Sequence, residues 1–228
     1  MILLVTFLSI GITVGAYLLS KVASKRFPSP LTTPVFFSTT LIILLLLLLN
    51  INYDDYTIAK EIMTFLLGPA TVALAVPLYK YRDTLKKHSI PALLGIVFGT
   101  VSTMISAVAL AKLLNLPNEV IASSSVKSVT VPVAVEVSAI IGGDPALTAA
   151  FVVATGILGT TLGPWLMNAT NITHPLSRGL SLGTISHGQG TAQAATEGEL
   201  QGAIAGVAMG LAAIFTAIIA PIMVPFFL

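Results

Sequence analysis

The chain contains no cysteine and few charged residues. The absence of cysteine among its 228 residues excludes disulfide bonds and thiolate metal sites. Its three histidines occur in no HExxH or paired-histidine spacing, so we expect no metal site and no cofactor. Charged residues make up 9% of the chain, whereas a soluble domain carries about 25%. The composition therefore argues against a soluble protein.

Apolar residues dominate what is present. Hydrophobic residues account for 55% of the chain, and about 20 consecutive apolar residues cross a bilayer as a helix. The chain length allows about eight such spans and leaves no room for a soluble domain, so we expect one all-α membrane bundle over residues 1–228. The net charge of +2 is too small to indicate nucleic-acid binding.

Basic residues beside the apolar segments predict an orientation. Seven of them lie in two clusters: Lys21, Lys25, Arg26, Lys80, Arg82, Lys86 and Lys87. Cytoplasmic loops are enriched in Lys and Arg, so we expect residues 21–26 and 79–88 in the cytoplasm and the N-terminus outside. No basic residue precedes the apolar run 2–20, which is typical of a transmembrane helix and not of a cleaved signal peptide.

Three segments contain residues that interrupt helices. These residues are Gly68, Pro69, Pro132, Gly183, Gly188 and Gly190. Proline removes a backbone donor and clashes with the preceding turn, and glycine weakens a helix interior by about 1 kcal/mol relative to alanine. Segment 179–198 is polar and glycine-rich enough to predict a re-entrant loop. Because lipid cannot satisfy free backbone groups, we expect residues 66–77, 123–136 and 183–195 to converge near the bilayer midplane.

An internal repeat is compatible with this pattern. The hexapeptides TVALAV at 71–76 and TVPVAV at 130–135 agree at four of six positions. Interrupted spans at related positions are typical of transporter sites. Short matches of this kind also arise by chance between apolar segments. The sequence therefore does not identify which two segments would be related by a pseudo-symmetry.

Two charged residues, Lys127 and Glu136, lie in the middle interrupted segment. An ionised group at the centre of a membrane helix costs about 2.5–3.5 kcal/mol, so their presence indicates a function. One alternative is a kinked helix whose lysine reaches the interface. Another is an ion pair between the two residues, which requires the helix break because residues nine apart lie on opposite faces of a continuous helix.

The motifs LLGPATVALAVPLYK, KSVTVPVA and GTISHGQGTA resemble the LrgB/CidB family of bacterial membrane proteins. The resemblance covers nearly the whole chain and implies a multi-pass protein of the bacterial cell (inner) membrane. Family members are described as antiholin-like modulators of murein hydrolase activity and autolysis, beside a holin-like partner of the LrgA/CidA type. Others are described as transporters of pyruvate in bacteria, or of glycolate and glycerate in plastids, where one chain carries both modules.

The resemblance leaves two functions open. One is a carrier of small monocarboxylates, pyruvate- or glycolate-like, working with a separate LrgA/CidA-like subunit. The other is an antiholin-like regulator of autolysis that acts through its holin-like partner and needs no polar cavity. The interrupted spans favour the carrier. We expect no enzyme, because no catalytic triad or metal set is apparent, and a homo-oligomer is also compatible with the sequence.

The carrier hypothesis predicts a binding site at the helix breaks. Half-helix N-termini offer free amides and positive potential to a carboxylate. The candidate binding residues are Thr71, Lys127, Ser128, Thr130, Ser186, His187, Gln189 and Thr191. Glu136 and His187 are candidates for proton coupling, since imidazole changes charge near neutral pH; for His187 the alternative is a structural hydrogen bond. Arg178 is either a carboxylate clamp or an interfacial anchor.

Overall fold

The structure is a computed structural model that describes residues 2–27, 29–73 and 75–228. These ranges are mainly helical and contain no strand, which confirms the all-α class. The chain divides into two compact units, Met1–Ala75 and Val76–Leu228, and we describe each by itself. The organisation as a single domain over residues 1–228 stays a prediction.

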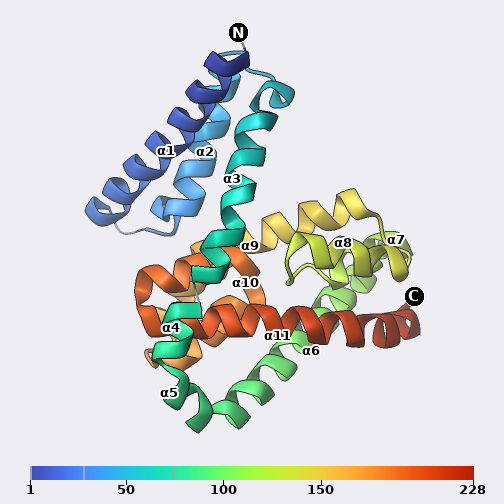
Figure 1. The fold of residues 1–228 in the computed structure, drawn as a ribbon. Coiled ribbons are helices and arrows are strands. Elements are labelled where there is room, and N and C mark those ends of the chain that lie inside the picture. The colour runs from blue at the N-terminus through green and yellow to red at the C-terminus, as the bar shows by residue number, and fades with distance from the viewer. Residues whose placement is uncertain (1, 28, 74) are drawn as a thin grey trace. The chain divides into compact units, whose positions relative to one another are not determined.

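The first unit contains three helices and one 3-10 turn. These are α1 (Ile2–Arg26), η1 (Pro30–Thr32), α2 (Pro34–Leu48) and α3 (Tyr53–Ala73) (Figure 1). Helix α1 packs against both α2 and α3, and the hydroxyl groups of Thr13 and Tyr56 lie 2.8 Å apart across the α1–α3 contact. Leu47 and Leu48 of α2 are 69% and 77% exposed within the described chain, as expected of a helix that faces lipid.

The break predicted at Gly68 and Pro69 is wrong. Helix α3 continues through both residues to Ala73, and α4 begins at Ala75. A proline removes only one hydrogen bond from a helix, and transmembrane helices tolerate this loss when the freed carbonyl finds another partner. The approach of residues 66–77 to the other two interrupted segments stays a prediction.

The second unit contains three long apolar helices. Its elements are α4 (Ala75–Lys80), α5 (Arg82–Lys87), α6 (Ser89–Leu113), α7 (Asn118–Ser125), α8 (Val131–Ile140), α9 (Pro145–Ala169), α10 (Pro175–Glu197), α11 (Glu199–Met223) and η2 (Val224–Phe227). Helices α6, α9 and α11 each have 25 residues and are therefore about 37 Å long, enough to cross a bilayer. With α1, they are the four described helices long and apolar enough to do so. The protein is therefore a multi-pass membrane protein.

The segment formed by α7 and α8 enters the unit and returns to the same side. The backbone N–H of Asp144, which follows α8, donates to Ser123 Oγ in α7 at 2.8 Å, although 21 residues separate the two. On this side Asn118 Nδ2 also donates to the carbonyl of Leu228 at 3.1 Å, near the end of α11. The two helices have eight and ten residues, so each is too short to cross a bilayer.

The break in this segment lies between Ser125 and Val131, which confirms the interruption predicted around Pro132. Thr130 has extended backbone and precedes α8, and Pro132 occupies the first turn of α8. Proline is tolerated there because N–H groups in the first turn of a helix have no acceptor within the helix, so the missing N–H of proline breaks no hydrogen bond. The two short helices are held by an apolar cluster of buried residues: Met104, Ala122, Val126, Val129, Ala134, Val137, Ile141, Val152, Ala220 and Val224.

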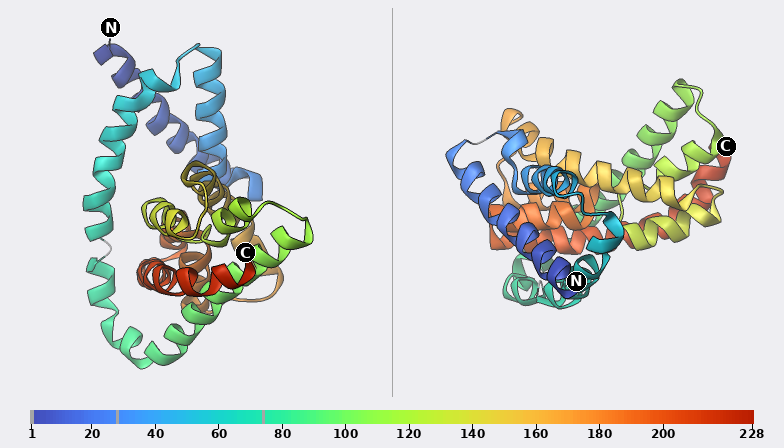
Figure 2. Two further views of the ribbon diagram at one scale, coloured as in Figure 1. Left: turned by 90° about the vertical axis from the view of Figure 1, so that its right-hand side faces the viewer. Right: turned by 90° about the horizontal axis from the view of Figure 1, so that it is seen from above.

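Helix α10 lies at the other end of the unit. Helix α10 packs closely against α11 (Figure 2). It lies beside the beginning of α11, whereas α7 and α8 lie beside the end of α11 (Figure 1). Near the beginning of α11, Lys80 pairs with Glu199, whose hydrogen bond and negative charge raise the pKa of Lys80 above its ordinary value. The two interrupted segments thus enter this unit from opposite ends.

Candidate functional site

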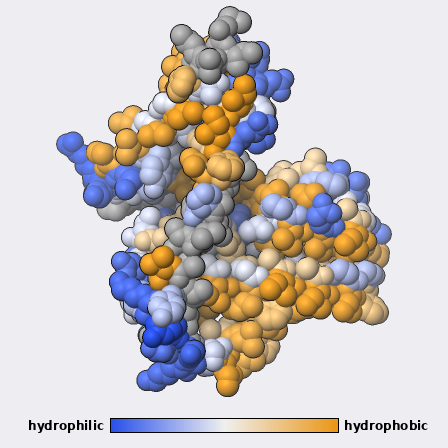
Figure 3. All heavy atoms as spheres, viewed as in Figure 1, coloured by the Kyte–Doolittle hydropathy of each residue, from blue (hydrophilic) through white to orange (hydrophobic). Residues whose placement is uncertain are grey.

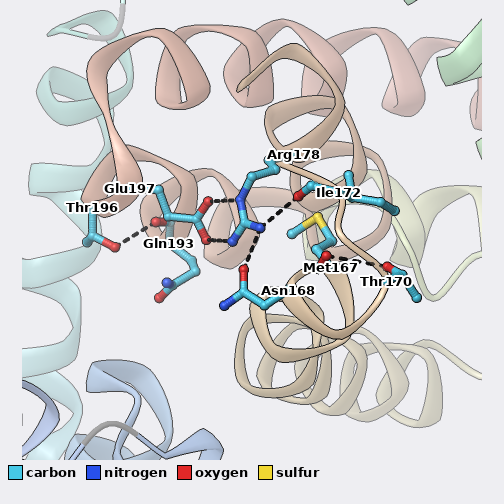
Figure 4. Close-up of polar contacts among 8 residues, drawn as sticks. All are labelled: Met167, Asn168, Thr170, Ile172, Arg178, Gln193, Thr196 and Glu197. Carbon is cyan, nitrogen blue, oxygen red and sulfur yellow. Dashed lines mark hydrogen bonds and ion pairs between the residues drawn. The ribbon is translucent and has the colours of Figure 1, made fainter. Parts of the chain in front are cut away.

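Helix α10 is a helical hairpin and not a continuous helix. Arg178 near its beginning and Glu197 at its end form two hydrogen bonds, Nε to Oε2 at 2.6 Å and Nη2 to Oε1 at 2.9 Å (Figure 4). In a straight helix, residues 19 apart lie about 28 Å from each other. The chain reverses at His187, where φ is 44° and ψ is −130°. The re-entrant segment predicted for residues 179–198 is confirmed.

Arg178 closes the base of this hairpin. Besides its two bonds to Glu197, its Nη1 donates to Asn168 Oδ1 at the end of α9 at 2.8 Å and to the carbonyl of Ile172 in the loop after α9 at 3.0 Å (Figure 4). Protein acceptors therefore occupy the planar fork of donors that would otherwise clamp a carboxylate. Arg178 therefore has a structural role, which differs from both sequence interpretations, a carboxylate clamp and an interfacial anchor.

The ion pair predicts a stability effect. The side chains of Arg178 and Glu197 are only 11% and 15% exposed, so Glu197→Gln leaves the guanidinium without its charged acceptor and is expected to cost about 1.5–3 kcal/mol. Glu199→Gln is the matched control, because the Lys80–Glu199 pair is 57% and 62% exposed and pairs of this kind contribute little. Thermal unfolding in detergent measures both variants. Equal melting temperatures for the two would contradict this role of the pair.

The tip of the hairpin is buried and strained. The ring Nε2 of His187 lies 3.0 Å from the carbonyl of Val152 in α9 and donates to it, and Thr191 Oγ1 donates to the carbonyl of His187 at 3.0 Å. The backbone angles of His187 are sparsely populated by residues other than glycine and cost about 1–3 kcal/mol. The structural hydrogen bond considered for His187 is present, and strain of this kind is typical of functional segments.

Glycines of α9 make room for the tip. A Cβ atom on Gly156 would lie 2.8 Å from His187 Nε2, and one on Gly159 would lie 3.0 Å from Ser186 Cβ. The amide oxygen of Gln189, also at the tip, is buried and has no hydrogen-bond partner in the part of the chain that the structure describes. The tip therefore presses directly against the backbone of α9.

The hairpin turns at His187, so the prediction that Gly183 and Gly190 break the helix is wrong. Both glycines instead allow close packing: a Cβ on Gly183 would overlap the backbone of Ala205 in α11, and one on Gly190 would overlap the carbonyl of Leu182. Gly188 directly follows the turn. In the sequence, a glycine that allows close packing of helices cannot be distinguished from a glycine that breaks a helix.

A cavity of about 470 Å³ lies between the two interrupted segments. Lys127, on the turn before α8, and Ser186, beside the tip of α10, both line it. Its other walls come from α9 and α10: Thr155, Leu158, Gly159, Leu162, Gly163, Leu166, Met167, Ser181, Leu182 and Ile185. Two of the three segments predicted to converge therefore do so, at this cavity.

Lys127 has no carboxylate partner among the described residues. The ion pairs found there are Lys80–Glu199, Arg82–Asp83 and Arg178–Glu197. The Lys127 ammonium group lies 3.4 Å from Ser128 Oγ, at the edge of hydrogen-bonding distance. Glu136 is exposed on α8 and does not pair with Lys127, so the ion pair considered from the sequence is not formed.

The surroundings of the cavity favour an anion. Helix α8 begins four residues after Lys127, and the second half of α10 begins just after Ser186. Each helix N-terminus carries roughly half a positive charge and unpaired N–H groups, and Lys127 adds a full charge. Across the described ranges, no group of three or more His, Asp or Glu side chains is placed to hold a metal ion.

The cavity contains only part of the predicted residue set. Lys127 and Ser186 line it, Ser128 is buried beside Lys127, and Thr130 precedes α8. The side chain of Thr71 lies outside the described residues. Sequence reasoning missed Thr155 and Ser181, because an isolated Ser or Thr in an apolar helix usually bonds to its own backbone.

Most of the chain is similar to known proteins. It is similar to the uncharacterized protein YwbG of Bacillus subtilis (strain 168), with 40% identity over 186 residues, covering 82% of this chain and 83% of YwbG. It is also similar to the uncharacterized protein YxaC of the same organism, with 37% identity over 188 residues and 82% of each chain covered. No solved structure matches it. Residues 13–226 match the LrgB-like family, and the protein therefore belongs to that family of membrane proteins.

Proposed function

We propose that this protein is a carrier, and not an enzyme, that moves small monocarboxylates such as pyruvate or glycolate across the bacterial cell membrane. The observation that supports this best is the cavity that Lys127 and Ser186 both line. Interrupted helices that meet from opposite sides are typical of secondary transporters, whose substrate sites lie near the bilayer midplane. A protein that only regulates a partner has no use for such a cavity.

The residues of the cavity have complementary roles in this proposal. The Lys127 ammonium group neutralises the substrate carboxylate, and the hydroxyl groups of Thr155, Ser181 and Ser186 bond to its keto or hydroxy oxygen. The apolar walls exclude water, which strengthens each of these interactions. Transport then needs the hairpin tip to move relative to α9, and the strained backbone at His187 supports such a movement.

A second subunit belongs to the proposal. The plastid relatives join both family modules in one chain, so this chain, which contains only the LrgB-like module, works beside an LrgA/CidA-like membrane protein. The alternative from the family resemblance, an antiholin-like regulator of murein hydrolase activity, then describes a consequence of metabolite or proton flux. It becomes the primary function if the pair assembles but carries no substrate.

Uptake into proteoliposomes tests the proposal. The purified protein is reconstituted with and without an LrgA/CidA-like partner, and the uptake of labelled pyruvate, glycolate and lactate is measured. We expect saturable uptake of at least one acid and competition by the unlabelled acids. Protein-free liposomes are the control. Absence of uptake in every combination, while the two subunits still assemble, would reject the carrier in favour of the regulator.

Proton coupling through His187 is a separate prediction. A monocarboxylate that crosses alone moves one charge against about 2.3 kcal/mol per 100 mV, and a co-transported proton removes this opposition. We expect His187→Gln to retain a hydrogen bond to Val152 and to lose pH-driven accumulation, while downhill exchange survives. Accumulation is measured against an imposed pH gradient.

Glu136→Gln is the comparison, because Glu136 is exposed on α8 and lies outside the cavity lining. Loss of accumulation in this variant alone would assign the proton to the carboxyl group. Unchanged pH dependence in both variants would leave sodium coupling or facilitated diffusion.

A further inference from the structure

A second cavity, distinct from the one that contains Lys127, lies between α6 and α11. It has a volume of about 360 Å³. Its apolar walls come from α6, α11 and the first half of α10: Ala92, Leu93, Ile96, Leu176, Leu180, Ile204, Val207 and Leu211. We call this cavity the α6–α11 groove. Because α6 and α11 are both long enough to span the membrane, lipid is the medium beside them.

One end of the groove is basic. Lys86, His88 and Ser89 line this end, where α5 meets the beginning of α6, and Lys87 is the adjacent residue. Neither lysine takes part in an ion pair with another described residue. The nearby carboxylate at the start of α11, Glu199, is already paired with Lys80. This end of the groove therefore carries an uncompensated positive charge.

The groove matches the shape of a lipid. It extends along α6 from Ser89 to Ile96, which at 1.5 Å per residue is about 10 Å. Figure 3 shows hydrophilic side chains gathered around α5 and hydrophobic side chains along the surface of α11. The basic end lies at the end of a spanning helix, where lipid headgroups are found, and the apolar walls continue into the hydrocarbon region.

We propose that the α6–α11 groove binds an anionic phospholipid. Lys86 and Lys87 hold its phosphate, Ser89 donates to a phosphate oxygen, and an acyl chain lies along Leu93, Ile96 and Val207. Basic pockets between transmembrane helices on the cytoplasmic side are suited to anionic headgroups. A free phosphate would meet only the basic end, so the apolar walls point to a lipid. This inference is independent of carboxylate transport.

Native mass spectrometry of the delipidated protein tests the groove. Phosphatidylglycerol and phosphatidylcholine with the same acyl chains are titrated into the protein in neutral detergent. We expect preferential binding of phosphatidylglycerol, lowered about 5-fold for each lysine removed in Lys86→Gln/Lys87→Gln. The matched control Lys21→Gln/Lys25→Gln removes the same charge from two other exposed lysines and is expected to keep the preference.

A second pair of variants tests the apolar walls without changing charge. Val207→Trp fills the groove and is expected to lower binding of phosphatidylglycerol, whereas Ile214→Trp, at an exposed site on α11 outside the groove, is expected to leave it unchanged. Equal binding of the two lipids by the unmodified protein, or an unchanged preference in Lys86→Gln/Lys87→Gln, would overturn the proposal. If glycerol phosphate competed with phosphatidylglycerol as effectively as the lipid itself, the groove would bind only an anion and not an acyl chain.

Discussion

Replacement of Lys127 by methionine is expected to lower carboxylate uptake by about 10- to 100-fold. This range corresponds to the loss of a hydrogen bond to a charged group, about 1.5–3 kcal/mol. Lys127 lines the same cavity as Ser186 and has no ion-pair partner among the described residues. Its charge is therefore available to an anion. The measurement is initial uptake into proteoliposomes at substrate concentrations below saturation.

Lys127→Met also separates function from stability. An unpaired ammonium group in the membrane interior is costly, and methionine keeps an unbranched apolar chain in its place. We therefore expect a melting temperature at least equal to that of the unmodified protein. Lys112→Met, at an exposed site in the last turn of α6, is the control and is expected to transport normally. Full uptake by Lys127→Met would show that the cavity is not the substrate site.

Gly183→Ala is expected to cause a large loss of stability. A Cβ atom at this position would lie 2.7 Å from Ala205 Cα and would overlap the Ala205 carbonyl oxygen. The obstacle is backbone, which cannot move aside as a flexible side chain can. Overpacking of this kind typically costs about 1–3 kcal/mol and sometimes more. The hairpin would be forced away from α11, and its tip would lose register with α9.

Gly210→Ala provides the matched control for this prediction. Gly210 lies in α11, and a Cβ atom there would meet nothing within 4 Å. Because alanine favours a helix over glycine by about 1 kcal/mol, this variant is expected to be neutral or more stable. Thermal unfolding and the yield of monodisperse protein in detergent measure both variants. Similar stabilities for Gly183→Ala and Gly210→Ala would show that the α10–α11 contact adjusts to a side chain.

Local chemistry made several features predictable from the sequence. Low charge and long apolar runs determine an all-α membrane protein, because a backbone in lipid must satisfy its own hydrogen bonds. The break before Pro132 and the re-entrant α10 were predictable, since proline and clustered polar and glycine residues disfavour a straight apolar helix. The same reasoning failed at Gly68 and Pro69, where α3 continues. A single proline leaves one carbonyl unpaired, and the surroundings of the helix decide whether it breaks.

By itself, the sequence determined the class of the protein and the approximate positions of two interruptions. Only the tertiary structure decided which residues meet across them. Arg178 reaches Glu197, and Lys127 shares a cavity with Ser186, because α10 folds back at His187 and α7–α8 returns to its own side. Hydrophobicity and helix propensity act between near neighbours along the chain. Pairings between residues 19 or more apart depend on how packed helices place their ends, which no local pattern encodes.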